Sequence, residues 1–331
     1  MTDDVVSIVM AMYNTERYVH EAIESVLRQD YPHFELVIVD DGSTDGGHEV
    51  VQRYSDPRIR LIRTENRGLS AARNRGVDES RGKYVTFLDS DDLLTAMSLS
   101  SRLTALPQTG AEVAFSRNVL VVDISSDSGS IALGRAHYAS PSWTVWAGKD
   151  LISMQVDGTF FVFSQSFMID RRVFQRIGGF NPLIKVNVDV EFSSRLLPAT
   201  QSLVETFAPF YVYRRRRDSL SAINSRRKAA ESLRTLRQTH RNLAPYLVGR
   251  EDRVAQDLFD RCVEAFPYWT DEHRRTMAEA RHRRGGEPFD LACVGGPSSQ
   301  AVARLLGWPA GRLVNFASNY LKHNVLASLR I

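Results

Sequence analysis

The chain has 331 residues, of which 43% are hydrophobic and 24% charged, and its formal net charge is +3, which is typical of a soluble globular protein with one large domain or two ordinary ones. Its two cysteines, Cys262 and Cys293, lack CxxC spacing, which argues against a disulfide framework or a zinc knuckle. No apolar run approaches the roughly 20 residues that span a bilayer, and the first residues, MTDDVVSIVM, are acidic where a secretory signal would be basic, so we expect a cytoplasmic protein.

The first ninety residues alternate between strand and helix patterns. The β-branched apolar run VVSIVMAM is typical of an interior strand, and the spacing of Val19, Ala22, Ile23 and Val26 is that of an amphipathic helix. The expected elements are a strand at 5–12, a helix at about 16–29, a strand at 34–40, a helical stretch within 42–54, a strand at 59–63, a helix near 69–77 and a strand at 83–89. This alternation predicts a parallel sheet with helices on both faces, which binds ligands at the carboxyl ends of its strands.

The remaining residues have more varied patterns. Residues 123–135 predict a polar loop, and residues 159–180 predict a strand and then a short helix that ends at two glycines. Helical periods dominate from about 226, and an amphipathic helix at 311–331 is expected to serve in core or oligomer contacts or, alternatively, at a membrane surface. Residues 214–284 hold 18 Lys and Arg against 10 Asp and Glu, which indicates either an anionic partner or a solvated helical face.

Three carboxylates fall within four residues in the stretch FLDSDD, at 87–92, where a predicted strand ends. Their mutual repulsion disfavours such a cluster unless a positive charge offsets it. Asp89 and Asp91 would lie near one point, and hard oxygen ligands suit Mg²⁺ or Mn²⁺, which often share coordination with substrate phosphates. The alternative is a capping run for a helix that begins at Asp92–Leu93.

Two motifs in the same region have features of a nucleotide site. In VDDGSTDGG, Asp40 or, in preference, Asp41 could accept hydrogen bonds from a ribose or a base edge, although a capped turn is the simpler interpretation. In NRGLSAARNRG, a helix start at Gly68–Leu69 favours anions, and Arg73 is one turn into that helix. For Arg75 we expect an ordinary surface position.

Later motifs offer groups for the reaction itself. In DVE, Asp189 or Glu191 could act as a general base, or both could cap the following helix. The four arginines of YVYRRRR could clamp a leaving diphosphate or form a basic patch on a loop. Trp143 could stack on an acceptor sugar, although packing is the commoner role of such aromatic residues.

In this order and at these spacings, the motifs resemble those of the family 2 glycosyltransferases over about the first 225 residues. The resemblance implies the GT-A fold, an α/β fold with a Rossmann-like, mostly parallel sheet flanked by helices. It places a nucleotide-sugar-binding and catalytic domain at 1–225, before a mainly helical region at 226–331. It also implies that Ala11, Tyr13 and Asp41 line the base site, that Arg73 and Asp89 contact the nucleotide, that Asp91 binds the metal, and that Asp189 is the catalytic base.

Further residues complete the predicted site. Glu16 and Ser90 are expected to contact the nucleotide sugar, and Asp89 is expected to bind Mn²⁺ or Mg²⁺ together with Asp91. Arg214 and Arg216 are expected to bind the diphosphate. Glu191 and Trp143 are expected to contact the acceptor. The sequence departs from the family pattern at two positions. Val188 stands where the family often has an acid before its base, and Arg216 stands where it commonly has a histidine, so a His–metal contact is not expected there.

We therefore expect an inverting glycosyltransferase that moves a sugar from a nucleoside-diphosphate sugar, with UDP as the expected nucleotide, to a hydroxyl of a glycan, cell-envelope or lipid-linked acceptor. The alternative is a catalytically idle nucleotide-sugar-binding scaffold. A dehydrogenase is disfavoured because AMYNTERY, not GxGxxG, follows the first strand, and a nucleotidyltransferase would need a Gly-rich basic loop there. No nucleic-acid partner is expected. Residues 226–331 are expected to form an oligomer interface or to dock an acceptor at the inner face of the membrane.

Overall fold

The computed structural model describes residues 4–123, 130–132, 143–156, 163–208, 210–215 and 226–246. The chain divides into two compact units. The first contains residues 1–152 and 160–222, and the second contains residues 153–159 and 223–331. The individually predicted site residues that the structure describes all lie in the first unit.

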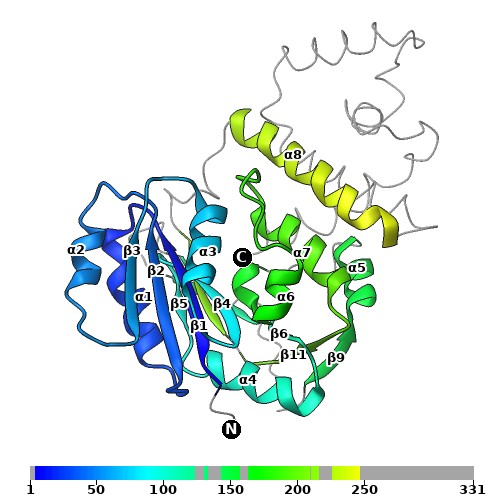
Figure 1. Cartoon of the computed structure of the whole chain (residues 1–331), viewed down its shortest axis with the longest axis horizontal. Helices are drawn as coiled ribbons and strands as arrows, with labels where there is room; N and C mark the ends of the chain where they lie inside the picture. Colours follow the sequence, from blue (N-terminus) through cyan, green and yellow to red (C-terminus); the bar gives the residue numbers. More distant parts are fainter. Residues whose placement is uncertain are drawn as a thin grey trace, which may run out of the picture. The chain divides into compact units, whose positions relative to one another are not determined.

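Strands and helices alternate through the first ninety residues, as the sequence predicts (Figure 1). In chain order, the elements of this part are β1 (Val6–Met12), α1 (Glu16–Leu27), β2 (Phe34–Asp40), α2 (Gly47–Gln52), β3 (Ile59–Arg63), α3 (Leu69–Glu79) and β4 (Tyr84–Asp89). They are followed by β5 (Leu93–Leu94), α4 (Ser98–Thr109), β6 (Val113–Phe115), β7 (Val119–Asp123), β8 (Ser130–Ala132), β9 (Thr144–Ala147), α5 (Gly148–Val156), the 3-10 helix η1 (Ser164–Ser166), β10 (Phe167–Asp170), α6 (Arg171–Arg176), α7 (Val188–Ala199), β11 (Ser202–Glu205), β12 (Tyr211–Arg215), α8 (Arg226–Leu243) and η2 (Ala244–Tyr246).

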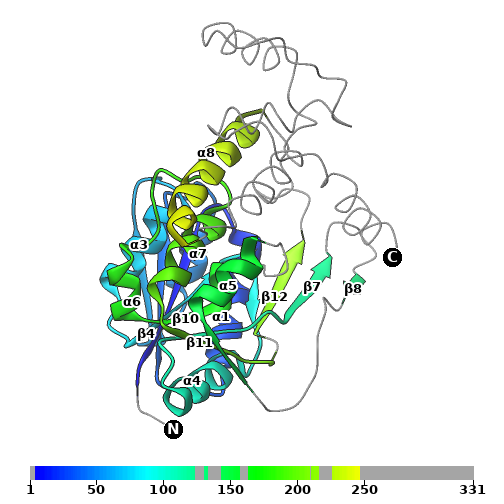
Figure 2. The same cartoon turned by 90° about the vertical axis from the view of Figure 1, so that its right-hand side faces the viewer.

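Among the described residues, eight strands form one sheet in the order β3-β2-β1-β4-β10-β6-β11-β9. The strands from β3 to β4 run parallel, whereas β10 is antiparallel to both of its neighbours. A smaller sheet has the order β5-β12-β7-β8, and Figure 2 shows β12, β7 and β8 next to one another. The predicted α/β fold with a mostly parallel central sheet is confirmed.

Both faces of the parallel strands are covered. Val6, Ile8 and Met10 of β1 belong to a core cluster that also contains the buried face of α1 and residues of α4. Successive side chains on a strand point to opposite faces, and Val9 lies on the other face, next to Gly76 of α3. A strand covered on both sides needs apolar residues at successive positions, which explains the unbroken apolar run in the sequence.

One sequence-based expectation in this part of the chain is wrong. The alternative interpretation of the acidic stretch places a helix start at Asp92–Leu93, but Leu93–Leu94 form the short strand β5, and the next helix begins at Ser98. Leu94 and Leu93 pair with Tyr211 and Val212 of β12. This pairing partner lies more than a hundred residues away in the sequence, so a local capping pattern could not indicate it.

The later expectations were largely correct where the structure describes the chain. The strand and short helix expected within 159–180 are β10 and α6, followed by Gly178 and Gly179 with positive φ. The polar stretch at 123–135 contains β8, which the sequence did not predict. Helix α8 agrees with helical periods after 226, whereas the amphipathic helix expected at 311–331 lies outside the described residues. In the part of the chain described here, no helix has the length and apolar character needed to cross a membrane.

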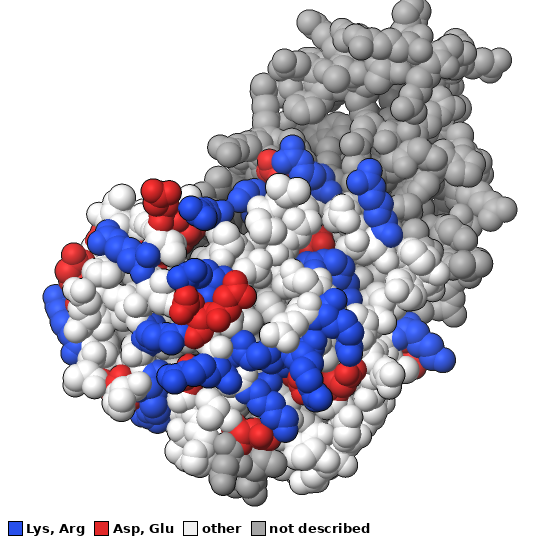
Figure 3. All heavy atoms as spheres, in the orientation of Figure 1, with Lys and Arg blue, Asp and Glu red and all other residues white. Residues whose placement is uncertain are grey.

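Charged side chains of both signs are mixed on the surface of the first unit. Figure 3 shows a face rich in Lys and Arg, with acidic side chains among them. Ion pairs account for part of this mixture: Arg75 pairs with Glu79 at 2.7 Å, and Arg176 pairs with Glu112 at 3.1 Å. Exposed pairs of this kind contribute only about 0–1 kcal/mol each. The side chain of Arg75 is 54% exposed, which confirms the surface position expected for it.

Candidate active site

The candidate site lies at the carboxyl ends of β2, β1 and β4. The strand register aligns Met12 with Asp40 and Ala11 with Asp89, so the residues that follow these strands meet at one edge of the sheet. Ala11 is half-buried in β1, and Tyr13, the first residue after the strand, is 49% exposed. This edge is where open α/β sheets bind their ligands.

Arg73 joins two of the predicted functional carboxylates. Its guanidinium donates to Asp89 Oδ1 at 2.7 Å and to Asp189 Oδ1 at 3.4 Å, and it is only 1% exposed. Burial lowers the pKa of Arg73, but the nearby charges of Asp89 and Asp189 outweigh this effect and hold its pKa above the ordinary value. The fold therefore brings together three residues that lie far apart in the sequence.

Asp189 reaches Arg73 from the first turn of α7. The preceding residue but one, Asn187, has φ of 54°, a left-handed conformation that Asn tolerates better than most residues and that turns the chain into the helix. The loop before it is held to α3, because Asn74 bonds both the main-chain N–H and the carbonyl of Phe180 at 2.8 Å. Phe180 also stacks on Phe192 of α7 with centroids 4.2 Å apart. These contacts link the position of Asp189 to that of Arg73.

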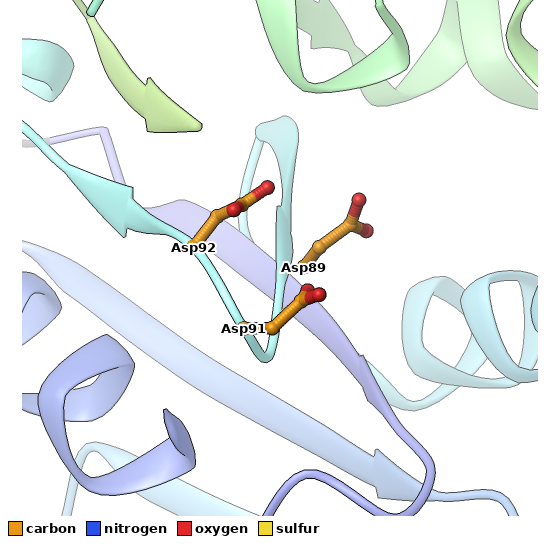
Figure 4. Close-up of side chains that lie close together, drawn as sticks. All are labelled: Asp89, Asp91 and Asp92. Atoms are coloured by element: carbon orange, nitrogen blue, oxygen red, sulfur yellow. The ribbon is translucent and has the colours of Figure 1, made fainter. Parts of the chain in front are cut away.

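The acidic cluster forms the turn between β4 and β5 (Figure 4). Ligand oxygens of Asp89, Asp91 and Asp92 lie within 4.8 Å of one another. Hard oxygen donors in this arrangement suit Mg²⁺ or Mn²⁺, and a divalent cation would offset the repulsion between the carboxylates. The donor set thus fits the expected metal.

Asp92 differs from its two neighbours because it is buried. Its carboxylate accepts hydrogen bonds from the Tyr211 hydroxyl and the Arg214 main-chain N–H, both at 2.7 Å. Burial, together with the charges of Asp91 and Asp89, raises the pKa of Asp92 well above its ordinary value. The Tyr211 hydroxyl also accepts from the Asp89 main-chain N–H at 3.3 Å, so β12 holds the acidic turn from behind.

The nucleotide-side candidates Asp41, Glu16 and Ser90 are engaged in loop contacts. The Asp41 carboxylate accepts from the main-chain N–H groups of Arg67 and Gly68, both at 2.8 Å, just before α3. Glu16 accepts from Gly46 N–H at 3.0 Å, and buried Ser90 accepts from the Thr15 hydroxyl at 2.8 Å. These bonds connect the loops around the predicted base site, and no bound nucleotide is needed to explain them.

The two predicted diphosphate arginines have different outcomes. Arg214 is 5% exposed, its guanidinium is paired with Glu21 of α1, and it lies 5.7 Å from the ring of Tyr18. Its main-chain N–H donates to the Asp92 carboxylate, so in this conformation Arg214 stabilises the acidic turn. Arg216 lies outside the described residues.

Both acceptor candidates have structural contacts. Glu191 is 1% exposed and forms a two-pronged pair with Arg195 at 2.7 and 2.8 Å, which in turn donates to the carbonyls of Ile177 and Gly179. Trp143 is partly buried and packs against the core cluster that contains β1 and α1. These contacts favour structural roles for both residues.

Comparison with known proteins identifies the family of the chain. The family described as Glycosyl transferase family 2 matches residues 7–178, which is more than half of the chain. The chain belongs to this family. The matched range contains Arg73 and the acidic cluster but ends before Asp189.

Curated relatives of this family 2 chain come from bacteria. It is 28% identical to glycosyltransferase GlyA of Streptococcus pneumoniae serotype 4 over 226 residues, which cover 67% of this chain and 32% of GlyA. It is 38% identical over 113 residues to the putative teichuronic acid biosynthesis glycosyltransferase TuaG of Bacillus subtilis, covering 33% of this chain and 45% of TuaG. Over 107 residues it is 38% identical to WfgD of Escherichia coli, a UDP-Glc:alpha-D-GlcNAc-diphosphoundecaprenol beta-1,3-glucosyltransferase, covering 32% of this chain and 42% of WfgD. The chain thus spans less than half the length of each of these relatives.

Solved structures share the fold. The structure of S. aureus TarS 1-349 in complex with UDP has a TM-score of 0.58 and 17% sequence identity, over 82% of this chain and 78% of that one. The complex of the same protein with UDP-GlcNAc gives a TM-score of 0.56 and 16% identity, over 87% and 94% of the two chains. At this identity the similarity establishes the GT-A type of fold for the family 2 chain and nothing more specific.

Two further residues at the candidate site were not predicted from the sequence. Gln165 is 4% exposed, and its amide nitrogen donates to Asp89 Oδ2. The hydroxyl of Tyr211 contacts both Asp92 and the main chain of Asp89. A signal for Gln165 exists in the stretch TFFVFSQSFMID, where three polar residues interrupt an apolar run, because buried polar groups need hydrogen-bond partners.

Proposed function

We propose that this chain is an inverting glycosyltransferase that moves a sugar from a nucleoside-diphosphate sugar to an acceptor hydroxyl. The observation that carries the proposal is the pair of hydrogen bonds from Arg73 to Asp89 and Asp189. Through them, the acidic turn suited to a metal and a diphosphate lies next to a carboxylate suited to deprotonate an acceptor. Donor and acceptor chemistry would then meet at one guanidinium.

In this mechanism Asp189 accepts the proton of the acceptor hydroxyl. The acceptor oxygen attacks the anomeric carbon from the side opposite the diphosphate, a new glycosidic bond forms, and the nucleoside diphosphate leaves with the electrons of the broken bond. Position matters more than an unusual pKa for such a base. Asp189 has a 24% exposed side chain and is held by Arg73, so it is both accessible and oriented. Alignment of the two reactants can supply up to about 7–11 kcal/mol of the barrier.

The acidic turn has a separate role on the donor side. Asp89 and Asp91 would hold Mn²⁺ or Mg²⁺, and Asp92 would support the turn from its buried position. When bound, the divalent ion would supply positive charge where the diphosphate leaves. Tyr13 and Ala11 lie at the adjoining strand end, where the base of the nucleotide would be placed.

The names of the relatives support a proposal for the substrate classes. TarS was solved with UDP-GlcNAc, and the name of WfgD specifies UDP-Glc as donor and a diphosphoundecaprenol-linked sugar as acceptor. We infer a UDP-sugar donor and a glycan or lipid-linked acceptor of the cell envelope for this chain. A cytoplasmic location at the inner face of the membrane, and acceptor docking or self-association through residues 226–331, belong to the same proposal.

The test begins with the full chain and a thermal-shift screen of nucleoside-diphosphate sugars, each with and without Mn²⁺. A ligand that prefers the folded state raises the melting temperature by mass action. The sugar nucleotide that stabilises most is then used to measure transfer to added glycans or water. No stabilisation by any sugar nucleotide would contradict the proposal, and stabilisation without turnover would favour the idle scaffold.

Asp189→Asn separates the two halves of the site. We expect transfer to fall by at least about 10²–10⁴-fold, the range of a general base. UDP–Mn²⁺ binding, measured by calorimetry, should stay within about threefold of wild type, or about 0.7 kcal/mol, because the proposal places Asp189 on the acceptor side of the site. Asp78→Asn, an exposed position on α3, is the matched control and should keep full activity. Undiminished turnover in Asp189→Asn would remove Asp189 from the role of base.

A further inference from the structure

Asp89 is held from two sides. Arg73 of α3 donates to its Oδ1 atom, and Gln165 of η1 donates to its Oδ2 atom. An ionised carboxylate has about four lone-pair sites on its two oxygens. One site on each oxygen is therefore filled by a protein donor, and the other remains for a ligand.

The orientation of the Gln165 amide is determined by its neighbours. The carboxylate of Asp89 accepts hydrogen bonds, so the NH₂ end of the amide must face it. The amide oxygen accepts from the Ser164 hydroxyl at 3.3 Å, which occupies the opposite end. Gln165 and Ser164 are both almost fully buried, at 4% and 0% exposed. Water therefore does not compete with these bonds.

The main chain of Gln165 is held by a buried arginine. Arg102 of α4 is 0% exposed and donates to the carbonyls of Gln165 and Ser166 at 3.3 and 3.4 Å, to the Thr86 hydroxyl at 3.1 Å, and to Ser98. Among the described residues no carboxylate pairs with it, and burial lowers its pKa to about 9. A buried cation is costly without partners. These oxygens therefore stabilise the Arg102 guanidinium, and its hydrogen bonds in turn fix the main chain of Gln165 and Ser166. The Thr86 hydroxyl donates in turn to the carbonyl of Phe167, the residue of β10 that directly follows η1, and this bond links the end of η1 to β4.

We propose that Gln165 is a positioning residue for the donor site, one that orients Asp89 for the metal and the diphosphate, with Arg102 holding its main chain in place. This inference rests on the proposed function. The route runs from α4 through Arg102 to η1, and then through the Gln165 amide to Asp89. Gln165 itself contacts neither donor nor acceptor in this scheme; it acts through Asp89.

The test replaces the amide in the full-length chain. Gln165→Leu keeps the size of the side chain but removes the donor, and Gln165→Asn keeps an amide that is one methylene too short to reach Asp89. Gln29→Leu is the matched control, because Gln29 is also a buried glutamine, 9% exposed, whose amide bonds main-chain groups of Ser25, Thr95 and Leu99. UDP binding is titrated by calorimetry at a series of Mn²⁺ concentrations, and Mn²⁺ binding is followed by its paramagnetic resonance signal.

Both Gln165 variants should bind UDP–Mn²⁺ about tenfold more weakly, a loss of about 1.4 kcal/mol, because the charged Asp89 loses one of the two donors that orient it. The Mn²⁺ concentration for half-maximal binding should rise, and the KM for the sugar nucleotide should rise more than kcat falls. Gln29→Leu should lower the melting temperature without changing either metal or UDP affinity. If Gln165→Leu does not fold, Gln165→Asn is judged by the same criteria.

These measurements distinguish failure of the positioning role from failure of the proposed function. If wild type binds UDP–Mn²⁺ and both Gln165 variants bind it equally well, the positioning role is wrong and the proposed function stands. If Gln29→Leu loses affinity as much as Gln165→Leu does, the effect is general loosening and the positioning role is again wrong. If wild type itself shows no UDP–Mn²⁺ binding, the proposed function fails first.

Discussion

At the scale of single residues, the candidate site depends on the buried guanidinium of Arg73, which bonds both Asp89 and Asp189. Arg73 lies in contact distance of two aromatic rings, 5.2 Å from Phe180 and 5.8 Å from Phe87, and between two carboxylates. A guanidinium presents five donors in a rigid planar fork, whereas an ammonium group is a point charge with three rotatable donors on a flexible chain. Arg73 therefore has both a structural and an electrostatic role.

Replacement of Arg73 by methionine should cost more than an ordinary arginine substitution. We expect Arg73→Met to lower the free energy of unfolding by about 2–3 kcal/mol, below the 3–5 kcal/mol of a fully buried pair because Asp89 and Asp189 are 30% and 24% exposed. Arg75→Met on the same helix is the control and should change stability by less than about 0.5 kcal/mol. Chemical unfolding followed by circular dichroism measures both; equal losses would contradict the assigned role of Arg73.

At the scale of elements, helix α3 carries Arg73 and must lie close to the sheet. A Cβ atom at Gly76 would come within 2.3 Å of Val9 Cγ1 and 3.3 Å of Val39 Cγ2. Only a residue without a side chain allows this approach of α3 to β1 and β2. The glycine thus sets the distance between the helix and the strands whose ends form the site.

Gly76→Ala tests this close approach. Alanine normally stabilises a helix relative to glycine by about 1 kcal/mol, but overpacking against Val9 should reverse the sign and destabilise the fold by about 1–3 kcal/mol. The double variant Gly76→Ala with Val9→Ala should lose less than the sum of the two single losses, since the second change removes the clash. Thermal unfolding of the four proteins gives the coupling, and simple additivity would show that the helix is not held this closely.

At the scale of the whole molecule, a second polar network lies at the opposite ends of the strands from the site. Glu35 of β2 accepts from the Ser7 hydroxyl at 2.7 Å, from the Gly82 N–H at 3.0 Å and from the Arg81 N–H. Burial by itself raises the pKa of Glu35. The hydrogen bonds and the charge of Arg81 together lower it by more than burial raises it, so the pKa of Glu35 lies below the ordinary 4.5. The network joins β1, β2 and the chain entering β4 into one sheet edge.

Glu35 should make stability depend on acid pH. Because its pKa is lower in the folded protein than in the unfolded chain, its contribution is present above about pH 4.5 and is lost as pH falls through the folded-state pKa. Glu35→Gln should therefore be less stable than wild type by about 1–2 kcal/mol at pH 7, and the two should converge towards pH 3. Urea unfolding across pH 3–7 measures this, with exposed Glu49→Gln as control. A constant difference at all pH values would contradict the charged role.

Much of the fold and part of the site could be predicted from the sequence. Strands at 34–40 and 59–63 were placed to the residue, because apolar periodicity is a local property of the chain. The acids at 89–92 could be assigned to one edge of the sheet, since parallel strands end together. The same local reasoning failed at Asp92, where a capping pattern predicted a helix and the partner strand β12 decided otherwise.

The sequence by itself determined the order of strands and helices in the first ninety residues, the family, and which carboxylates lie at the strand ends. Only the tertiary structure decided what those carboxylates contact. Arg73 and Asp189 are 116 positions apart, and Gln165 and Asp89 are 76 apart. Hydrogen bonds over such separations depend on how helices and strands pack, and packing is set by side-chain shape and distance in space, which no repeat along the chain records. For that reason the pairing of Arg73 with both carboxylates, and the brace from Arg102 through Gln165, emerged from the folded chain alone.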